Sequence, residues 1–556
     1  MTNFSSFERK SSFKRLEEDM LDVLVIGGGI TGAGISLDAA TRGMRTAVLE
    51  MQDFAAGTSS RSTKLVHGGL RYLKQFEVKV VSETGSEREV VYENGPHVTT
   101  PEWMMLPFYK GGTFGPLMTN IGLRIYDYLA GVKKSERRTM FKAGEALERE
   151  PLLRRDGLSG AGYYVEYKTD DARLTIEVLK KAVQKGAVAL NYAKVTEFIY
   201  DESNKLCGVK VQDEISGRVH KVYAKKIVNA AGPWVDDLRE MDGSTNGKHL
   251  LLSKGVHLVF PKEIFPLQQA VYFNAPDGRM IFAIPRENKT YVGTTDTAYD
   301  GSKQHPVMTE KDRDYLLDAI QYIFPSLGLQ ADHVESSWAG IRPLIAEEGK
   351  DSPGEISRKD EIFVSESGLI SIAGGKLTGY RKMAEEVIDN VSEHFKEEGI
   401  LYSGSETKNL PIAGGEVGGS KGFTDFKRRK LELGRALGME ESKVMKLVKN
   451  YGANVDLIFD LFLERQEEAK RAGIDPLVFA ELLYCIEHEA VYKPADFFVR
   501  RTGALFFEIN WVKAHKDAVI PYMAKVLHWS EIQQEEYSRE LDQLLHDAVN
   551  PIKEDI

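Results

Sequence analysis

Residues 22–50 read DVLVIGGGITGAGISLDAATRGMRTAVLE, and this stretch decides the fold. Its apolar run from Val23 to Ile26 predicts a buried parallel strand that leads directly into a glycine-rich turn. A helical pattern follows as far as Arg42, and Gly43 ends it. A second strand is predicted for Thr46 to Leu49. This order of strand, glycine turn, helix and strand predicts the start of a Rossmann-type α/β domain.

Each glycine of the motif has a physical task. Gly27 allows the tight turn, Gly29 lets the backbone approach a pyrophosphate, and Gly32 lets the helix pack on the strand. The N–H groups around Thr31 at the helix start, together with the helix dipole, are suited to hold phosphates. Glu50 lies 21 residues after Gly29, where a carboxylate can accept hydrogen bonds from a ribose. We therefore predict a bound dinucleotide; the alternative is an ordinary tight strand–helix turn.

The bulk composition limits the class of protein. A chain of 556 residues exceeds what one hydrophobic core usually supports, so two or three domains are expected. The net charge of -10 argues against general nucleic-acid binding, which needs a basic surface. Cys207 and Cys485 are the two cysteines, so there is no disulfide framework. No apolar run of about 18 residues occurs, so no membrane-spanning segment is expected.

The first 20 residues combine aromatic and basic side chains. Phe4, Phe7, Phe13 and Leu16 stand among Arg9, Lys10, Lys14 and Arg15. The segment has no apolar core or cleavage site of a signal peptide. A short surface helix on anionic lipid is one interpretation. A frayed polar tail is the interpretation that we favour.

A second informative segment, residues 51–77, follows Glu50 and is rich in small and hydroxyl-bearing side chains. Thr58, Ser59 and Ser62 are among them. So little side-chain bulk suits the close approach of backbone to a large planar ligand. A flexible serine-rich loop is the alternative, but the apolar residues after Lys64 anchor the segment.

Further along the chain, the pattern predicts a return to the same nucleotide-binding sheet. Residues 77–93 and a segment from Asp170 to Gly186 are predicted helices, and 95–165 is expected to mix turns, short strands and a helix near 121–129. The run 224–228 predicts a buried strand that ends in a small-residue turn containing Ala231 and Gly232. Residues 250–345 are predicted to be β-rich. A strand at 368–373 then enters a second glycine-rich turn, Gly374 to Gly379, and a helix from Tyr380 to His394.

These observations predict three domains. The nucleotide-binding domain is discontinuous and comprises 20–94, 166–249 and 346–404. The substrate domain comprises 95–165 and 250–345. Residues 405–556 form a helical domain, because 425–549 follow a helical period almost throughout. No chemical constellation stands out there, and Arg500-Arg501 are interpreted as packing and solvated surface.

Seven blocks carry a family resemblance. They are GGGITGAG (27–34), GTSSRSTKLVHGGLRYL (57–73), IVNAAGPWVD (227–236), VGTTDT (292–297), GIRPL (340–344), IAGGKLTGYRKMAE (372–385) and PADFFVRRTG (494–503). On these blocks the chain resembles the FAD-dependent glycerol-3-phosphate dehydrogenases of aerobic bacteria. The resemblance covers nearly the whole length.

The resemblance implies an α/β fold with an inserted β-rich substrate domain of the glycine-oxidase and D-amino-acid-oxidase type, plus a C-terminal all-helical domain. It implies oxidation of sn-glycerol 3-phosphate to dihydroxyacetone phosphate through non-covalent FAD. Electrons would pass to membrane quinone from an enzyme held peripherally at the inner face of the plasma membrane, in the cytoplasm. No metal is expected. The oligomeric state stays open, with a homodimer as one option.

The residues of the expected site follow partly from chemistry and partly from the resemblance. A phosphomonoester carries about two negative charges near pH 7, so its pocket needs several cations. Arg71, Arg342 and Arg358 stand in turn-like contexts, and Lys376 and Tyr72 complete the expected substrate contacts. The residues expected to contact FAD are Gly27, Gly29, Thr31, Gly32, Glu50, Thr58, Ser59, Ser62, Lys64, Leu65, His67, Gly68, Gly69, Ala231, Gly232, Gly375, Lys376, Leu377 and Thr378.

The reaction also needs a base for the C2 hydroxyl proton. His257 is the predicted base, and Arg342 is the second predicted catalytic residue. A histidine satisfied within the sheet is the alternative interpretation of His257. His67 is its rival for the role of base. The turn Gly374–Thr378, with Lys376, is predicted to stabilise the anionic edge of the flavin.

Alternative functions remain open at this point. An oxidase that passes electrons to oxygen is the nearest, although its relatives carry an insertion that is not seen here. The same fold could act on an amino acid or another 2-hydroxy compound. A non-catalytic flavin-binding scaffold and an NAD-linked dehydrogenase are the remaining hypotheses.

Overall fold

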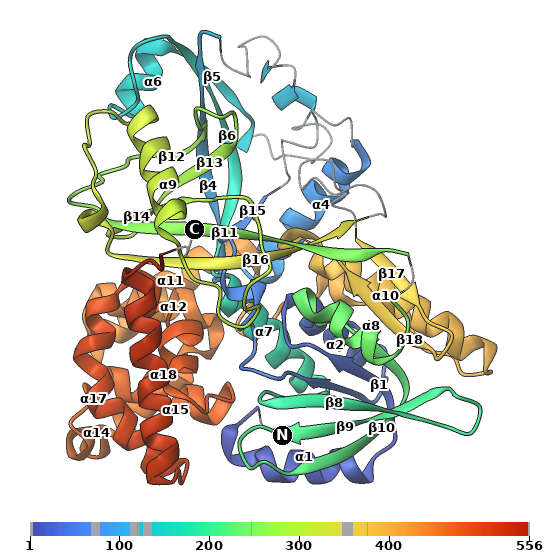
Figure 1. Cartoon of the computed structure of the whole chain (residues 1–556). Helices are drawn as coiled ribbons and strands as arrows, with labels where there is room; N and C mark the ends of the chain where they lie inside the picture. Colours follow the sequence, from blue (N-terminus) through green and yellow to red (C-terminus); the bar gives the residue numbers. More distant parts are fainter. Residues whose placement is uncertain are drawn as a thin grey trace.

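The computed structural model describes residues 4–67, 78–111, 119–120, 122–125, 136–245, 247–346, 360–374 and 376–553. Three parts are visible in Figure 1: a parallel sheet with helices, a second sheet of long strands above it, and a bundle of C-terminal helices beside both. The exact domain boundaries stay a prediction.

The first sheet is built around the strand that the glycine-rich motif follows. Its order is β17-β18-β10-β1-β2-β7, parallel except for β17. Its strands are β1 (Leu21–Ile26), β2 (Thr46–Leu49), β7 (Val188–Leu190), β10 (Val219–Asn229), β17 (Glu361–Val364) and β18 (Leu369–Ala373). β1 and β2 confirm the predicted strand–turn–helix–strand unit, and β18 shows that the chain does return to this sheet.

Three helices cover one face of this sheet. α2 (Ile30–Thr41), α7 (Asp171–Gln184) and α10 (Tyr380–Glu397) share one hydrophobic core with β1. A hairpin of β8 (Ala193–Tyr200) and β9 (Leu206–Asp213) continues antiparallel from β10. β8 was not predicted, and the predicted strand 224–228 is the end of a longer strand, β10. A short helix, α8 (Val235–Met241), follows β10.

The second sheet confirms that residues 250–345 are β-rich. Its order is β15-β11-β14-β13-β12-β4-β6-β3, with β16 beside β11 and β5 beside β6. The strands are β3 (Leu65–Val66), β4 (Thr99–Tyr109), β5 (Thr139–Lys142), β6 (Leu158–Thr169), β11 (His249–Pro261), β12 (Ala270–Asn274), β13 (Met280–Arg286), β14 (Lys289–Gly293), β15 (Thr297–Ala298) and β16 (Ser336–Ala346). The helices α6 (Ala143–Arg149) and α9 (Glu310–Ile323) pack on this sheet. The predicted helix α4 (Val78–Asn94) precedes β4, and its Val91 belongs to the core of the first sheet. The expectation of short strands in 95–165 was wrong, because β4 and β6 are 11 and 12 residues long.

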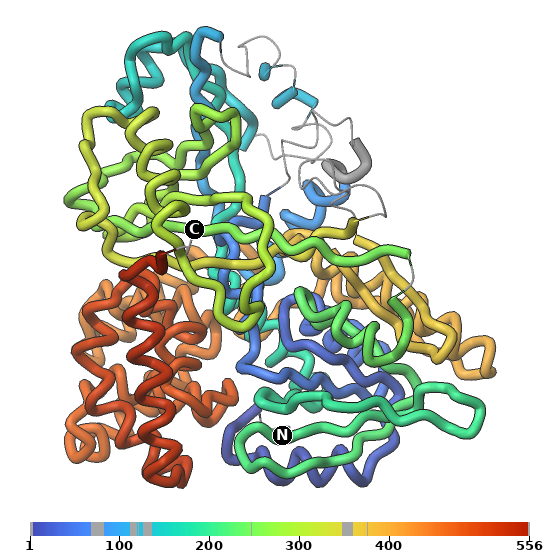
Figure 2. The backbone as a smooth tube through the Cα atoms, viewed as in Figure 1, coloured from blue at the N-terminus to red at the C-terminus, as the bar shows by residue number. Residues whose placement is uncertain are grey.

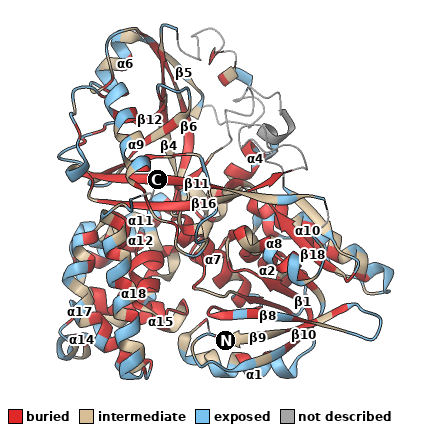
Figure 3. Ribbon diagram, viewed as in Figure 1, coloured by how far each residue is buried: buried red, intermediate tan, exposed pale blue. Residues whose placement is uncertain are grey.

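The C-terminal part is helical, as predicted. It comprises α11 (Gly419–Ala436), α12 (Glu441–Tyr451), α13 (Val455–Glu464), α14 (Gln466–Ala472), α15 (Pro476–His488), a π-helical turn (Asp496–Arg501), α16 (Ala504–Phe507), α17 (Ile509–Val526) and α18 (Glu531–Val549). Figure 3 shows buried residues on the inner sides of these helices and exposed residues on their outer sides. Within the part of the chain that the structure describes, no helix is both long and apolar enough to cross a bilayer.

The N-terminal segment is ordered, so the favoured interpretation as a frayed tail was wrong. α1 (Arg9–Glu18) buries Phe13 and Leu16 in the core on the outer face of the first sheet. Before it, Ser6 Oγ donates to Val491 O at 2.6 Å, which ties the segment to the C-terminal helices. Figure 2 shows this blue segment lying below the hairpin of β8 and β9. Phe13 and Leu16 therefore pack against protein rather than lipid, whereas Phe7 is half exposed.

His97, a buried histidine in the turn between α4 and β4, provides a test of the packing. His97 is 2 % exposed, and neither ring nitrogen has a hydrogen-bond partner among the described residues. Burial, with the charges of Arg173 and Lys180, lowers the pKa of His97 to about 3. The unfolded chain takes up this proton near pH 6.5, so in that window the unfolded state binds more protons and the stability falls as the pH falls.

We expect His97 to cost the protein about 2 kcal/mol of stability at pH 5 relative to pH 7. Substitution His97→Leu removes the titration, so the urea midpoint of the variant should fall less between pH 7 and pH 5. The same substitution at exposed His249 controls for the loss of one histidine. Equal acid sensitivity of His97→Leu and the wild type would contradict the prediction.

Candidate active site

One cavity of about 520 Å³ lies where the two sheets meet. Most of the residues predicted from the sequence line it. They are Gly27, Gly29, Thr31, Glu50, Thr58, Ser59, Ser62, Leu65, His67, Ala231, Gly232, His257, Arg342, Lys376, Leu377 and Thr378. The turns after β1, β10 and β18 contribute together, because the carboxyl ends of parallel strands share one sheet edge.

The glycines at one end of the cavity have no room for a side chain. A Cβ atom on Gly27, whose φ is +112°, would lie 2.4 Å from Ala230 O. On Gly29 it would lie 3.0 Å from Ser59 Oγ. Gly32 does not line the cavity; it packs α2 so tightly on the turn that a Cβ would lie 1.9 Å from Gly27 O. This cradle opens at the N-terminus of α2, which suits a pyrophosphate.

Glu50 closes the wall beside this cradle. Its Oε2 accepts a hydrogen bond from Gly28 N at 2.7 Å, and its Oε1 accepts one from Gln52 N at 2.8 Å. Burial raises the pKa of the Glu50 carboxyl, and these two N–H donors oppose the shift. The carboxylate thus stands at the cavity wall in a fixed orientation, where it fits the predicted contact with a ribose.

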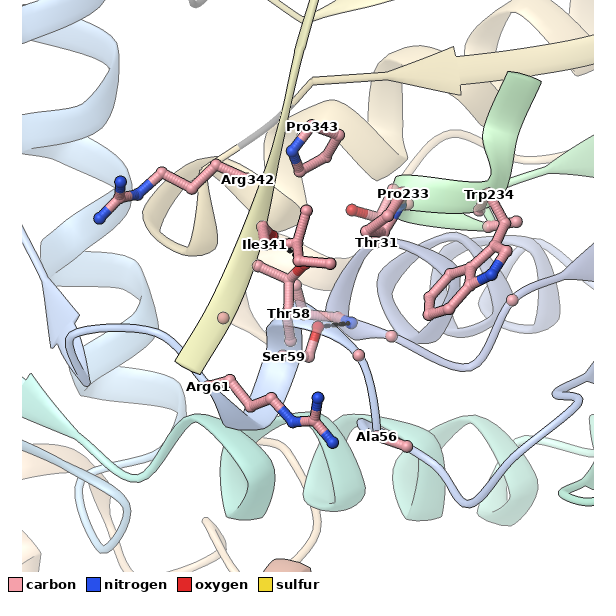
Figure 4. A pocket seen from close by; sticks show the side chains of 18 of the residues that line it. Thr31, Ala56, Thr58, Ser59, Arg61, Pro233, Trp234, Ile341, Arg342 and Pro343 are labelled. Atoms are coloured by element: carbon pink, nitrogen blue, oxygen red, sulfur yellow. Dashed lines mark hydrogen bonds between the residues drawn. The ribbon is translucent and has the colours of Figure 1, made fainter. Parts of the chain in front are cut away.

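The hydroxyl-rich segment bridges the two sheets. Ser59 Oγ accepts from Ile30 N at 2.9 Å, and Thr58 Oγ1 donates to Ile341 O of β16 at 2.7 Å. Figure 4 shows Thr58 and Ser59 between the start of α2 and β16. Because both sheets hold this segment, it is not a flexible loop.

Lys64 was expected to contact the cofactor, but the structure places it behind the cavity wall. Its Nζ donates to Asp171 Oδ1 at 2.5 Å and to Ser60 O at 3.0 Å, and the side chain is almost fully buried. Ser62 lines the cavity, although its hydroxyl also donates to Asp171, at 2.7 Å. Asp171 at the start of α7 therefore anchors the segment from below.

At the other end of the cavity, His257 lies on β11 with its ring stacked on Trp338 of β16, 4.6 Å between ring centroids. Its Nε2 lies 3.0 Å from Thr63 Oγ1, and its buried Nδ1 has no hydrogen-bond partner among the described residues. Burial, with the charges of Arg342 and Lys64, lowers the pKa of His257 well below its ordinary value. The imidazole is therefore neutral at pH 7.

Arg342 lies on β16, and its guanidinium is about one third exposed. It donates to Thr294 Oγ1 at 3.0 Å, Thr295 O at 3.2 Å and Asp296 Oδ1 at 3.3 Å. Gly255 on β11 leaves room for it, because a Cβ there would lie 2.6 Å from Arg342 Nη2. In Figure 4 the side chain extends away from Thr58 and Ser59, so it does not serve the same end as the glycine cradle.

The turn after β18 is fastened to the end of β3. Thr378 Oγ1 accepts from His67 N at 3.0 Å and donates to His67 O at 3.1 Å. Lys376 and Leu377 line the cavity beside them. Six predicted residues, Gly68, Gly69, Arg71, Tyr72, Arg358 and Gly375, lie outside the described residues.

Several lining residues were not predicted, among them Arg61, Thr63, Lys194, Val195, Trp234, Asp237 and Gln304. Trp234 lies two residues after Gly232 of the predicted turn, so extending that motif would have found it. Burial and the charge of Arg500 lower the pKa of Arg61 to about 10, which leaves it charged at pH 7. Lys194 and Val195 belong to β8, which the sequence pattern did not indicate.

The loop 299–307 joins all three parts of the structure at the cavity. Gln304 O accepts from Arg61 Nη1 at 3.3 Å. Lys303 pairs with Asp237 of α8, and His305 Nε2 lies 2.7 Å from Asp547 Oδ2 of α18. The loop therefore spans from the second sheet to the first and to the C-terminal helices.

Comparisons with known proteins agree with this geometry. A family model described as FAD dependent oxidoreductase matches residues 22–381. A second model, described as the C-terminal domain of alpha-glycerophosphate oxidase, matches residues 405–534. The first match spans both sheets, and the second lies in the C-terminal helical part.

Individual relatives cover the whole chain. The aerobic glycerol-3-phosphate dehydrogenase of Bacillus subtilis is 60% identical over 99% of both chains. The X-ray structure of the glycerol-3-phosphate dehydrogenase from Bacillus halodurans, complexed with FAD, has 50% identity and a TM-score of 0.86 over 99% of both chains. Glycine oxidase from Bacillus cereus, at 20% identity and a TM-score of 0.50, covers 67% of this chain and 97% of its own, and shows a shared fold.

Proposed function

From the premise that the chain belongs to the FAD dependent oxidoreductase family, we propose that it oxidises sn-glycerol 3-phosphate to dihydroxyacetone phosphate. One observation carries the proposal: a dinucleotide cradle and the groups His257, Arg342 and Lys376 line a single cavity. Bound FAD supplies the two-electron acceptor that takes the hydride from C2 of the substrate. The protein's own residues supply binding, orientation and a proton acceptor.

The cradle fits the ADP half of FAD. Gly27 and Gly29 leave space for the pyrophosphate, the start of α2 offers N–H donors, and Glu50 stands where a ribose would lie. At the other end, the turn at Lys376 and Thr378 would hold the flavin edge. No covalent attachment is proposed.

Arg342 and Lys376 are assigned to the phosphate of the substrate, together with Arg71, Tyr72 and Arg358 from outside the described residues. A phosphate dianion suits a guanidinium fork, which can donate two parallel hydrogen bonds. Arg342 already presents both Nη atoms to the oxygens of Thr294–Asp296, so its orientation is set before the substrate binds. An amino-acid carboxylate would need fewer cations.

His257 is assigned as the acceptor of the C2 hydroxyl proton. Because its pKa is lowered, the imidazole is unprotonated at working pH and can accept a proton. Thr63 and the stacked Trp338 fix the plane of the ring. His67 stays the rival base, although its backbone rather than its ring carries the bonds to Thr378.

This assignment predicts the pH dependence of the limiting rate of flavin reduction. The pKa of His257 is lowered, so the neutral form persists below pH 6.5, and the limiting rate should stay level between pH 6 and pH 8. The rate must be read at saturating substrate, because a phosphomonoester itself titrates near pH 6. The prediction would be contradicted if the wild-type rate fell by about half at pH 6.5 and this fall was absent when His257 is replaced by asparagine.

The substrate assignment is tested by anaerobic stopped-flow reduction of the FAD-loaded protein. We expect sn-glycerol 3-phosphate to bleach the flavin, while glycine and D-lactate leave it oxidised. Bleaching by one of those two compounds but not by glycerol 3-phosphate would replace the proposed substrate. A protein that holds FAD but is bleached by none of them would favour the non-catalytic scaffold.

The electron acceptor forms a separate proposal. We propose membrane quinone, with the enzyme in the cytoplasm and in peripheral contact with the inner face of the plasma membrane. Oxygen is the second candidate, favoured by the match of residues 405–534 to the domain of alpha-glycerophosphate oxidase. Re-oxidation of the reduced protein by a soluble quinone and by oxygen, followed in the same instrument, distinguishes the two.

A further inference from the structure

The proposed function leaves one motif without a task, the block PADFFVRRTG at 494–503 in the C-terminal helices. Its Arg500 and Arg501 are 7 % and 0 % exposed, so the interpretation of the pair as packing was right and as solvated surface was wrong. Both lie in the π-helical turn Asp496–Arg501. Such turns are rare and frequently mark functional sites.

Both arginines reach the same carboxylate of the first sheet. Arg500 Nε donates to Asp53 Oδ2 at 2.5 Å. Arg501 Nη1 donates to Asp53 Oδ2 at 2.7 Å, and its Nη2 donates to Asp53 Oδ1 at 3.0 Å. Asp53 is 1 % exposed and also accepts from Asn191 Nδ2 at 3.0 Å. Its two oxygens thus receive four donors.

Charge explains why two arginines are present. Burial by itself would raise the pKa of Asp53, but the charges of Arg501 and Arg500 lower it well below the usual value. Arg500 also pairs with Asp496 at 2.7 Å, and Arg501 donates to Glu489 O at 2.7 Å. Asp496 and Glu489 of the C-terminal part therefore orient the two arginines while these bind Asp53.

Asp53 lies in the segment that forms one wall of the cavity. Glu50, Met51, Ala56 and Gly57 of this segment line the cavity, whereas Asp53 points out of it toward the C-terminal helices. The backbone of the segment is bonded to the first sheet near its start, by Glu50 N to Leu190 O at 2.9 Å, Ala193 N to Glu50 O at 2.7 Å and Tyr192 N to Gln52 O at 2.7 Å, and further along by Ala55 N to Gly28 O at 3.1 Å. The Asp53 side chain adds a tie to the C-terminal helices, which none of these bonds provides. The ion pairs of Asp53 with Arg500 and Arg501 are the strongest charged contacts of this segment.

We propose that Arg500 and Arg501 are positioning residues for the cofactor: they hold Asp53, and through it the wall 50–57 and the Glu50 carboxylate, so that the C-terminal helical domain clamps the ADP half of FAD. This inference rests on the proposed use of FAD. Coupling between two sites is reciprocal, so bound FAD must also stabilise the docking of the C-terminal helices.

The test measures FAD affinity rather than turnover. Apoprotein of the wild type, Arg501→Gln and Arg500→Gln is titrated with FAD, and ADP is used as a competitor for the same site. We expect FAD affinity to fall by about 5- to 150-fold, the usual range of coupling between sites, with the same factor for ADP. Arg501→Lys keeps the charge but loses the fork, so it should recover part of the loss.

Arg42→Gln is the matched control. Arg42 is also a buried arginine with two aspartate partners, Asp38 at 2.6 Å and Asp389 at 2.7 Å, but it lies at the far end of α2 from the cavity. Its loss should lower the unfolding midpoint of the apoprotein and leave FAD affinity within about twofold of the wild type. Arg500→Gln and Arg501→Gln should lower both the unfolding midpoint and the FAD affinity.

Two results would overturn the clamp. The first is FAD affinity in Arg501→Gln equal to that in Arg42→Gln at a similar loss of midpoint. If the glutamine variants do not fold, hydrogen exchange of residues 50–57 is measured in Arg501→Lys apoprotein instead. The second overturning result is exchange there that is no faster than in the wild type. A wild type that binds no FAD refutes the proposed function instead, and one that binds FAD without oxidising glycerol 3-phosphate leaves the clamp standing.

Discussion

Replacement of Arg342 by methionine is expected to lower kcat/KM for sn-glycerol 3-phosphate by about 1000-fold. The side chain can give a phosphate dianion two charge-assisted hydrogen bonds, each worth about 1.5–3 kcal/mol, and every 1.4 kcal/mol is a factor of about ten. Methionine keeps much of the volume. It also leaves the carboxylate of Asp296 without its guanidinium, 3.3 Å away in the native site, so the pocket gains negative charge where the phosphate should bind.

The loss should be found mainly in the substrate concentration that gives half-maximal flavin reduction, because the phosphate is remote from C2. Arg342→Lys should recover part of the affinity but not the fork. Arg279→Met is the control, since Arg279 pairs with Asp277 at an exposed hairpin tip. A change of less than about tenfold in Arg342→Met would remove Arg342 from the phosphate site.

Substitution Gly32→Ala is expected to abolish useful FAD binding. The new Cβ would lie 1.9 Å from Gly27 O, a contact that only movement of α2 away from β1 can relieve. Overpacking of this kind costs about 1–3 kcal/mol of stability. The same movement displaces the N–H groups at the start of the helix from the pyrophosphate. Each hydrogen bond lost to the pyrophosphate is worth about 1.5–3 kcal/mol, so FAD affinity should fall by about 100-fold or more.

The ratio of flavin to protein absorbance after purification, followed by FAD titration of the apoprotein, measures this loss. Gly144→Ala in α6 is the matched control, because no atom lies within 4 Å of its added Cβ. Alanine in an open helical position is more stable than glycine by about 0.5–1 kcal/mol. The control should therefore bind FAD normally and unfold at a slightly higher denaturant concentration. Normal FAD content in Gly32→Ala would show that α2 adjusts without cost.

Local rules account for the parts of the site that were predicted. The strand, glycine turn and helix of residues 22–50 follow from periodicity and from the backbone freedom of Gly27, and both act between neighbours in the chain. The same holds for the turns after β10 and β18. Because parallel strands align their carboxyl ends, these three local predictions already imply that the turns meet at one edge.

The meeting of His257 and Arg342 depends on register, which the sequence pattern does not specify. In the pairing of β11 with β16, His257 lies opposite Trp338 and Arg342 opposite Ser253. Trp338 and Arg342 are four positions apart, an even offset, so His257 and Arg342 share one face of the sheet. A shift of one residue would place one of them on the opposite face.

The Rossmann-type start, the β-rich and helical parts and most of the cavity lining could be predicted from sequence, because periodicity, glycine geometry and the motifs are local properties. The tertiary structure alone decided that Lys64 lies behind the wall, that α1 covers the first sheet, and that Arg500 and Arg501 are buried against Asp53. The physical reason is that burial and ion pairing join residues hundreds of positions apart. An arginine pair reads the same in a sequence whether water or a buried carboxylate surrounds it.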